Sequence, residues 1–445
     1  MKNYEPIKRV MTLGCMLLAI AVMVIMFAIV WYRFYALTII YPFFRRGNWM
    51  VIAVYAFLLY LGLYINEGNK IGFYTYGQTL FSQLLAILLV NILMYIVISL
   101  IGRHFLWAVP MIGITCVEFV FMAAWTWMAD RLYHHIYPPH RMVLVSGKGR
   151  HVNELLRKMT TRQDKYQVRD RIDESEGAER ILPRLKNYDA VILCDLNIQL
   201  RNEITKYCYE NDIRIYVAPR ISDVIIRGAD EIHLFDSPLL LCRNYGLSIE
   251  QRLGKRIMDI VITTLCLILT SPFFLVIALS IKICDGGPVL YKQKRLTIGG
   301  KVFNIYKFRS MVPNAEELEG ARLAKKEDSR ITPVGKVLRR FRLDELPQLL
   351  NILKGDMALV GPRPERPELA EQICKDIPEF SYRLKVKAGL TGFAQVVGKY
   401  NTSPYDKLEL DLMYISKYSL ILDLKILLMT PKMLFIKDRT EGVDG

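Results

Sequence analysis

The 445-residue sequence predicts a membrane protein that combines membrane α-helices with an α/β fold. Hydrophobic residues make up 52% of the chain and charged residues only 23%, which is more apolar than an average soluble domain. The apolar residues gather in the first 130 positions and near residue 270, and strand and helix patterns alternate between these regions. We expect four N-terminal transmembrane helices, a Rossmann-like α/β domain, and a mainly helical C-terminal domain with a re-entrant membrane helix–break–helix.

This composition excludes several classes of protein. A disordered chain, a small disulfide scaffold and a purely soluble enzyme do not contain apolar runs of this length. A transporter with many spans is excluded because more than half of the chain reads as soluble. The eight cysteines form no C-x-x-C pair, so neither a zinc site nor a redox motif is indicated. No histidine lies beyond His233, so chemistry in the C-terminal half must proceed without this residue.

The first predicted domain, residues 1–140, contains four apolar runs that are candidate membrane spans. A span needs about 20 apolar residues, and only the second run is marginal. Lys2, Lys8 and Arg9 favour a cytoplasmic N-terminus by the positive-inside tendency, whereas three arginines in the first loop oppose it. The runs cover residues 10–31, 49–65, 79–101 and 105–128.

The second predicted domain, residues 141–247, has the strand and helix alternation of a parallel sheet. Gly147 and Gly149 form a G-x-G after the first strand, a candidate phosphate-binding loop. The third glycine of the dinucleotide motif is absent, because Val152 takes its place. The favoured interpretation is therefore a Rossmann-like module with degraded or no nucleotide binding. Strands are expected at residues 141–147, 190–195 and 213–218, and helices at 152–159 and 199–211.

The third predicted domain, residues 248–445, begins with a membrane segment. Residues 260–281 contain no charge, yet Lys255 precedes them and Lys282 follows, so both flanks look cytoplasmic. Pro272 removes a backbone donor in the middle, and the hydroxyl of Ser271 can bond the carbonyl that is freed. We expect a re-entrant hairpin at about residues 257–283, and the alternative is a fifth span with a proline kink.

Positive charge accumulates in this third domain. From residue 251 onward there are 32 lysines and arginines against 22 aspartates and glutamates, within a whole-chain charge of +16. The membrane context favours an anionic membrane surface or a phosphorylated small molecule as the partner, rather than nucleic acid.

Two adjacent acids stand out within this basic domain. Pro347 and Gly355 mark the start and end of a short helix, so Asp344 and Glu345 lie at or just before its N-terminus. The helix dipole favours anions there, so both acids should be ionised at pH 7. Taken alone, such a pair is usually just a helix cap.

The surrounding cations change this interpretation. Lys307, Arg309, Arg339 and Arg363 lie in nearby segments, and arginine matches phosphate geometry. Two carboxylates among cations, without histidine, suit phosphoryl chemistry: a carboxylate can hold Mg²⁺ or attack phosphorus to form an acyl phosphate. The residues by themselves do not say which carboxylate does which.

The C-terminal part of the chain, roughly 200 residues, resembles the bacterial sugar transferase family, the monotopic polyprenyl-phosphate glycosyl-1-phosphate transferases. The four N-terminal spans and the Rossmann-like insert resemble its long members, which initiate capsule or exopolysaccharide repeat units. Three positions depart from the usual pattern: LTIGG at residues 296–300, Ala388 before GLTG, and Lys399, where arginine is common. The matching motifs are KRIMD (255–259), Ser271-Pro272, YKFRSM (306–311), LDELPQ (343–348), KGDM (354–357), VGPRP (360–364) and GLTG (389–392).

The resemblance implies an enzyme that moves a sugar-1-phosphate from a UDP-sugar to undecaprenyl phosphate and releases UMP. It implies that Asp344 is the nucleophile that forms a covalent sugar-phosphoryl-aspartate, and that Glu345 is the Mg²⁺ ligand. Arg363 corresponds to a phosphate-binding arginine, and Lys307 and Arg339 to supporting basic residues. Arg309 and Gln348, within the matching motifs, are further candidates for binding the substrate phosphates.

The resemblance also implies a multi-pass protein of the bacterial plasma membrane whose catalytic domain faces the cytoplasm. Its expected partners are the UDP-sugar, undecaprenyl phosphate, membrane lipid and downstream glycosyltransferases of the same pathway, with a homodimer left open. The sugar is not determined, and glucose or galactose is expected from the long members. Two alternatives remain: a glycosyltransferase that moves the sugar without its phosphate, and a non-enzymatic scaffold that senses nucleotides.

Overall fold

The computed structural model describes residues 5–39, 42–147, 149, 151–242, 246–312, 330–398 and 402–431. The chain divides into two compact units, Met1–Arg220 and Ile221–Gly445. The first unit holds the N-terminal helices and most of the predicted α/β domain. The last part of the segment predicted as that domain, residues 221–247, belongs to the second unit.

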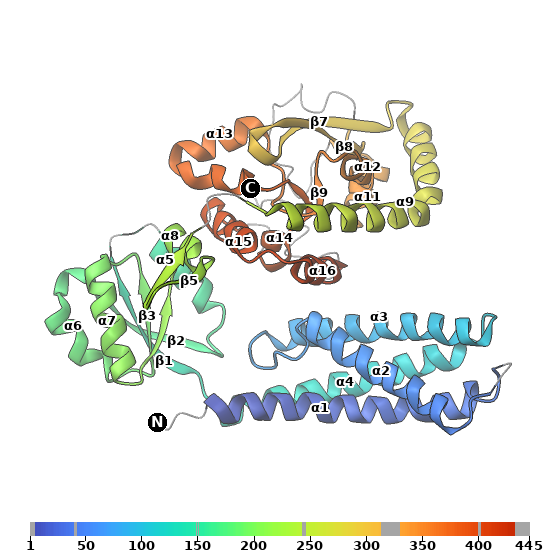
Figure 1. The fold of residues 1–445 in the computed structure, drawn as a ribbon, viewed down its shortest axis with the longest axis horizontal. Helices are drawn as coiled ribbons and strands as arrows, with labels where there is room; N and C mark the ends of the chain where they lie inside the picture. Colours follow the sequence, from blue (N-terminus) through green and yellow to red (C-terminus); the bar gives the residue numbers. More distant parts are fainter. Residues whose placement is uncertain are drawn as a thin grey trace. The chain divides into compact units, whose positions relative to one another are not determined.

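Four long helices form the N-terminal part of the first unit, and each is long and apolar enough to cross a membrane. They match the four apolar runs of the sequence. Helices adjacent in the chain pack together and α1 also packs against α4, which makes a bundle (Figure 1). The helices are α1 (Glu5–Val30), α2 (Arg45–Ile65), α3 (Tyr76–Gly102) and α4 (Val109–Ile136), and α1 continues into a π-helical turn, Trp31–Tyr35.

One acidic side chain is completely buried within this bundle. The carboxylate of Glu118 on α4 accepts hydrogen bonds from Tyr55 Oη on α2 (2.5 Å) and from Asn91 Nδ2 on α3 (2.7 Å). A polar group in an apolar interior is tolerated only when such partners are present. The network therefore fixes the register of three helices against one another.

A four-stranded sheet with the order β2–β1–β3–β4 forms the α/β part of the first unit, and all its neighbouring strands are parallel. This agrees with the predicted α/β domain. The sequence did not predict β2 or α6, because β2 alternates charged residues with few apolar ones. The elements are β1 (His140–Ser146), α5 (His151–Thr160), β2 (Tyr166–Asp173), α6 (Ala178–Leu185), β3 (Ala190–Cys194), α7 (Ile198–Glu210) and β4 (Arg214–Val217).

The candidate phosphate loop after β1 faces carboxylates. A Cβ atom on Gly149 would lie 1.7 Å from Asp195 Oδ2, and one on Gly147 would lie 2.9 Å from Glu174 Oε1. Residues 148 and 150 lie outside the described part of the chain. The interpretation of degraded or absent nucleotide binding stays a prediction.

The second unit contains the candidate site. A parallel pair of short strands, β9 and β10, lies within it, and two antiparallel hairpins, β5–β6 and β7–β8, precede that pair in the chain. The two adjacent acids, Asp344 and Glu345, are called the dyad below. The elements of the unit before the dyad are α8 (Ile221–Arg227), β5 (Asp230–Leu234), β6 (Ser237–Leu241), α9 (Ile249–Asp285), β7 (Leu290–Leu296), β8 (Val302–Phe308) and α11 (Pro333–Arg340). Its later elements are α12 (Gln348–Lys354), β9 (Ala358–Val360), α13 (Pro367–Asp376), the 3₁₀ segment η5 (Pro378–Lys385), β10 (Gly389–Thr391), α14 (Phe393–Val397), α15 (Pro404–Ser416) and α16 (Leu420–Met429).

Helix α9 is the fifth helix of membrane-spanning length and composition in the described chain. The break predicted at Ser271 and Pro272 is absent, and α9 stays helical through both residues. The ribbon instead changes direction along its length (Figure 1). Ser271 Oγ donates to the carbonyl of Ile268 at 2.9 Å, the group that loses its partner at Pro272. The expected role of the Ser271 hydroxyl is confirmed, and re-entry stays a prediction.

Both ends of α9 are tied to the same unit. Near the N-terminal end, Lys255 Nζ lies 2.5 Å from Asp423 Oδ2, and both side chains are buried. At the C-terminal end, Asp285 forms an ion pair with Arg309, the residue that directly follows β8. Because one compact unit holds both ends, the contacts favour a helix that enters the membrane and returns.

We expect single cysteines at positions 253 and 284 to be labelled from the same side of the membrane. Leu253 and Cys284 flank the apolar stretch and are exposed. The measurement compares a membrane-impermeant maleimide on right-side-out and inverted vesicles, with the other cysteines replaced. Gly77→Cys and Arg103→Cys, at opposite ends of α3, are the control and should react from opposite sides. Labelling of positions 253 and 284 from opposite sides would contradict re-entry.

Candidate active site

The two adjacent acids lie in a 3₁₀ turn, Leu343–Glu345, between α11 and α12, and this turn is called the carboxylate turn below. Arg342 precedes the turn with φ of 53°, a left-handed conformation that changes the direction of the chain. Pro347 is the N-cap residue of α12, which confirms that the acids directly precede a helix. Asp344 is only 8% exposed, so the turn holds its carboxylate largely out of water.

Three cations from three different segments converge on Glu345. Its Oε1 atom lies 3.1 Å from Lys307 Nζ on β8 and 3.2 Å from an Nη atom of Arg363 in the loop after β9. Its Oε2 atom lies 3.7 Å from Arg342 Nη1. The Glu345 side chain is 13% exposed, so these pairs are only weakly screened by water.

The two neighbouring carboxyl groups differ in their electrostatics. Burial raises the pKa of Asp344, and the negative charge of Glu345 adds to this increase against the opposing effect of Lys307. Burial also acts to raise the pKa of Glu345, but Lys307, Arg363 and Arg342 outweigh it and hold that pKa well below its usual range. Glu345 is thus a fixed anion, whereas Asp344 is a desolvated carboxyl group beside a cluster of cations.

Lys307 is positioned by the β7–β8 hairpin and by one buried amide. Asn351 on α12 accepts a hydrogen bond from Tyr306 N (2.9 Å) and donates one to Asn304 O (2.8 Å). Asn351 is fully buried. It therefore fastens β8, which carries Lys307, to the helix that follows the dyad.

Arg363 is positioned by a close contact between two backbone segments. Gly361 N donates to Thr391 O (2.8 Å), and Gly389 N donates to Pro362 O (2.9 Å). A Cβ atom on Gly389 would lie 2.1 Å from Gly361 N, so only glycine allows this approach. The VGPRP and GLTG motifs are thus two sides of one structure that presents Arg363 to Glu345.

The remaining predicted site residues divide into two groups. Gln348 is buried at the start of α12, and Arg339 is in the last turn of α11, where its charge acts on the dyad. Arg309 pairs with Asp285 and donates to Pro288 O (2.8 Å). Its partners in the described chain therefore lie near the end of α9 and not in the carboxylate turn.

Sequence reasoning missed two buried groups that support the site. Asn351 follows Gln348 by one turn and lies between Leu350 and Ile352, and a polar residue within this apolar helix was an available signal. The Lys255–Asp423 pair had no local signal, because 168 positions separate its members.

A magnesium ion at the turn that holds Asp344 and Glu345 stays a prediction. The described residues contain no group of three or more His, Cys, Asp or Glu side chains that could hold a metal alone. Mg²⁺ is commonly bound by one or two carboxylates together with waters and substrate phosphates. Asp344 and Glu345 are the carboxylates of this turn, and both oxygens of Glu345 already contact lysine or arginine.

Helices long and apolar enough to cross a membrane, together with a largely buried pair of acids surrounded by lysine and arginine, indicate a membrane protein with a cationic site. Residues 250–437 match the model of the family described as bacterial sugar transferase. The chain belongs to the bacterial sugar transferase family.

Curated relatives agree with this assignment. An undecaprenyl-phosphate N-acetylgalactosaminephosphotransferase of Aeromonas hydrophila is 39% identical, over 55% of this chain and 58% of its own length. A UDP-glucose:undecaprenyl-phosphate glucose-1-phosphate transferase of Klebsiella pneumoniae is 37% identical, over 59% of this chain and 56% of its own length. A transferase of the same name from Caulobacter vibrioides is 41% identical, over 42% of this chain and 71% of its own length. The chain thus spans little more than half the length of the first two relatives.

We expect Asn351→Leu to destabilise the second unit by about 1–3 kcal/mol for each backbone group left buried without a partner. The physical reason is that the N–H of Tyr306 and the C=O of Asn304 lose their partner, and a leucine at the fully buried position 351 cannot replace it. Thermal unfolding of the purified protein measures the loss. Asn351→Asp, which keeps an acceptor for Tyr306 N, should lose less. Equal stability of wild type and Asn351→Leu would contradict the assigned role.

Proposed function

We propose that this protein transfers a sugar-1-phosphate from a UDP-sugar to undecaprenyl phosphate and releases UMP. The observation that carries the proposal is the buried Asp344 carboxyl group beside an anionic Glu345, which forms ion pairs with Lys307, Arg342 and Arg363. Cations in this number can neutralise a diphosphate, and a carboxylate among them can reach phosphorus. The activities for which the relatives are named support the same donor and acceptor classes.

The proposed reaction proceeds in two displacements. A carboxylate oxygen of Asp344 attacks the phosphorus that carries the sugar, and the bond from this phosphorus to the bridging oxygen breaks, so that UMP leaves. A phosphate oxygen of undecaprenyl phosphate then attacks the same phosphorus and releases the Asp344 carboxylate. Covalent catalysis of this kind divides one difficult transfer into two easier ones.

The other site residues would stabilise charge during these steps. Glu345 would hold Mg²⁺, which when bound supplies positive charge to the diphosphate oxygens. Arg363 would bind a phosphate group, with Lys307 and Arg339 supporting it. Because Glu345 already orients Lys307 and Arg363, the positive groups are in place before the substrate arrives.

The proposal includes a location and a pathway. The second unit would face the cytoplasm of a bacterial plasma membrane, where UDP-sugars are available, and the product would enter capsule, exopolysaccharide or O-antigen synthesis. The fixation of both ends of α9 by one unit supports a position of this unit on a single side of the membrane, and the need for UDP-sugars selects the cytoplasmic side. Downstream glycosyltransferases would act on the product, and a homodimer stays a prediction.

We expect Asp344→Ala to lower UMP release by at least about 10⁴-fold, the order of loss seen when a covalent nucleophile is removed. Wild-type membranes are supplied with undecaprenyl phosphate and a panel of UDP-sugars, and released UMP is measured; this panel also identifies the sugar. Without the lipid, mass spectrometry should find the sugar phosphate on the peptide that contains Asp344. A glycosyltransferase of the alternative kind would release UDP, and a scaffold would release nothing from any donor. Wild-type turnover in Asp344→Ala would refute the nucleophile assignment.

We expect Lys307→Met to move the acidic limb of the pH profile of kcat/KM to higher pH by roughly one unit. A pKa shift of one unit corresponds to about 1.4 kcal/mol of interaction between the lysine and the ionised carboxylate. Lys307 lowers the pKa of Asp344, so its loss raises that pKa further, and a higher pH is needed to ionise the nucleophile. Activity should therefore fall most on the acidic side and recover as the pH rises. Lys294→Met, at an exposed position on the same hairpin, is the matched control and should keep the wild-type profile. An unchanged limb in Lys307→Met would contradict this electrostatic role.

A further inference from the structure

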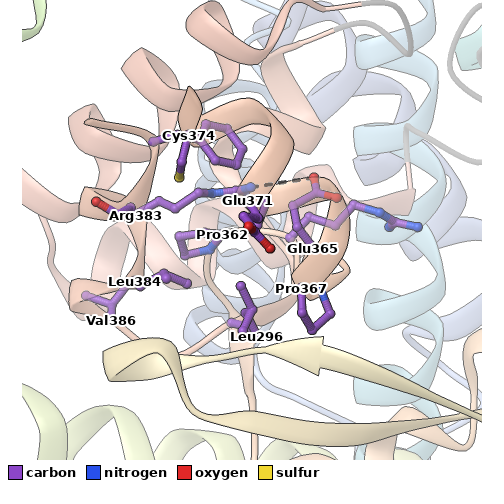
Figure 2. Close-up of a pocket in the computed structure, with 14 residues that line it drawn as sticks. Leu296, Pro362, Glu365, Pro367, Glu371, Cys374, Arg383, Leu384 and Val386 are labelled. Carbon is purple, nitrogen blue, oxygen red and sulfur yellow. Dashed lines mark hydrogen bonds and ion pairs between the residues drawn. The ribbon is translucent and has the colours of Figure 1, made fainter. Parts of the chain in front are cut away.

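A cavity of about 350 Å³ opens beside the carboxylate turn. It is bounded by the end of β7, the loop that carries Arg363, helix α13 and the η5 segment (Figure 2). Arg363 lines the cavity and its guanidinium binds Glu345. One residue thus connects the cavity with the dyad, and a ligand in the cavity would have its near end beside the candidate reaction centre.

The walls of the cavity are mainly apolar. Small-molecule sites of roughly this volume, about 300–1,000 Å³, usually have an apolar lining with a few fixed polar groups. Here the apolar walls include Leu296, Ala370, Phe380 and Val386. A hexose would bring hydroxyl groups on all sides that such walls cannot satisfy, whereas a nucleobase has two flat apolar faces and a polar edge.

The polar groups of the cavity are gathered around one buried arginine. Arg383 is 4% exposed; it pairs with Asp411 Oδ2 at 2.7 Å and lies 3.5 Å from Glu365 Oε1. In Figure 2 its side chain extends across the cavity toward Glu365. Arg383 Nε is buried and has no hydrogen-bond acceptor within the described part of the chain. A buried donor of this kind costs free energy unless a ligand satisfies it.

Positive charge also collects at the side of the cavity nearest the dyad. Arg295, adjacent to Leu296, donates to Pro364 O at 3.0 Å, and it lies close enough to Arg363 for the two charges to repel. Burial and this repulsion lower the pKa of Arg295 to about 10. A bound diphosphate would relieve the repulsion, as expected where the phosphates of a nucleotide lie.

We propose that this cavity binds the uridine half of the UDP-sugar, with the base against the apolar walls and its polar edge at Arg383 and Glu365. The uracil edge presents two carbonyl acceptors on either side of an N–H donor. An arginine donor beside a carboxylate acceptor complements that pattern, and cytosine, with an unprotonated ring nitrogen there, does not. The inference rests on the proposed function for the identity of the donor.

The polyprenyl acceptor is a poorer occupant. Its chain is far longer than a 350 Å³ cavity can hold, and it reaches the enzyme from the bilayer. Helix α13, which forms one wall, lies at the opposite end of the second unit from the C-terminal part of α9 (Figure 1). The cavity is therefore better placed for the water-soluble donor.

The test measures binding of UMP to the full-length protein in lipid nanodiscs by isothermal titration calorimetry. Ala370→Phe places a ring inside the cavity and should weaken UMP binding at least tenfold, and should raise KM for the UDP-sugar more than it lowers kcat. Gln372→Phe, exposed on the same helix and not part of the cavity lining, is the matched control and should bind UMP as wild type does. Unchanged UMP affinity in a folded Ala370→Phe variant would overturn the proposal. If that variant kept its UMP affinity but changed its preference among UDP-sugars, the cavity would bind the sugar instead.

A second variant tests the base edge without filling the cavity. Glu365→Gln offers an amide that can donate to cytosine, so the ratio of UMP to CMP affinity should fall about tenfold, a change that a purely structural role of Glu365 would not cause. An unaltered ratio would contradict the assigned contact. If wild type binds UMP in this cavity but releases none from any UDP-sugar, the proposed function fails and the cavity assignment stands. If turnover is normal and Ala370→Phe binds UMP normally, the cavity assignment fails and the proposed function stands.

Discussion

The ion cluster around Glu345 is the constraint on which the candidate site depends. Lys307 comes from a hairpin, Arg363 from a loop and Arg342 from the turn of the dyad itself. Glu345 is the most buried member, and burying its charge without these partners would be unfavourable, so the three cations stabilise the turn in its place. The same cluster leaves more positive than negative charge around Asp344, which is the condition that a diphosphate substrate requires.

Neutral contacts bring these charged segments together. Asn351 joins β8 to α12, and the close approach of Gly361 and Gly389 joins the loop of Arg363 to β10. Lys255 and Asp423 then fasten α9 to α16 within the same unit. A membrane helix is thus tied directly to the framework that positions the carboxylates, and its depth in the bilayer would set the height of the site above the lipid phosphates.

The sequence predicted the parts of this structure that follow local periodicity or short motifs. The four apolar runs, three of the parallel strands and the helix after Glu345 correspond to observed elements, because hydrophobic pattern, proline and glycine act over a few residues. It could not predict that Arg309 pairs with Asp285, or that α9 stays helical through Pro272, because both depend on side-chain contacts. The cavity at Arg383 was equally inaccessible, since its walls come from segments that are separate in the chain.

The basic character of the C-terminal half has two physical sources that composition alone cannot separate. Lys255, Lys307, Arg363 and Arg383 are paired with carboxylates inside the second unit, so their charge acts at short range on buried groups. Only the exposed remainder can attract anionic headgroups over a Debye length. Added salt should therefore weaken attraction to the membrane surface more than it weakens the buried pairs at the site. The same net charge thus acts over two different distances, at long range from the exposed cations and at short range within the buried pairs.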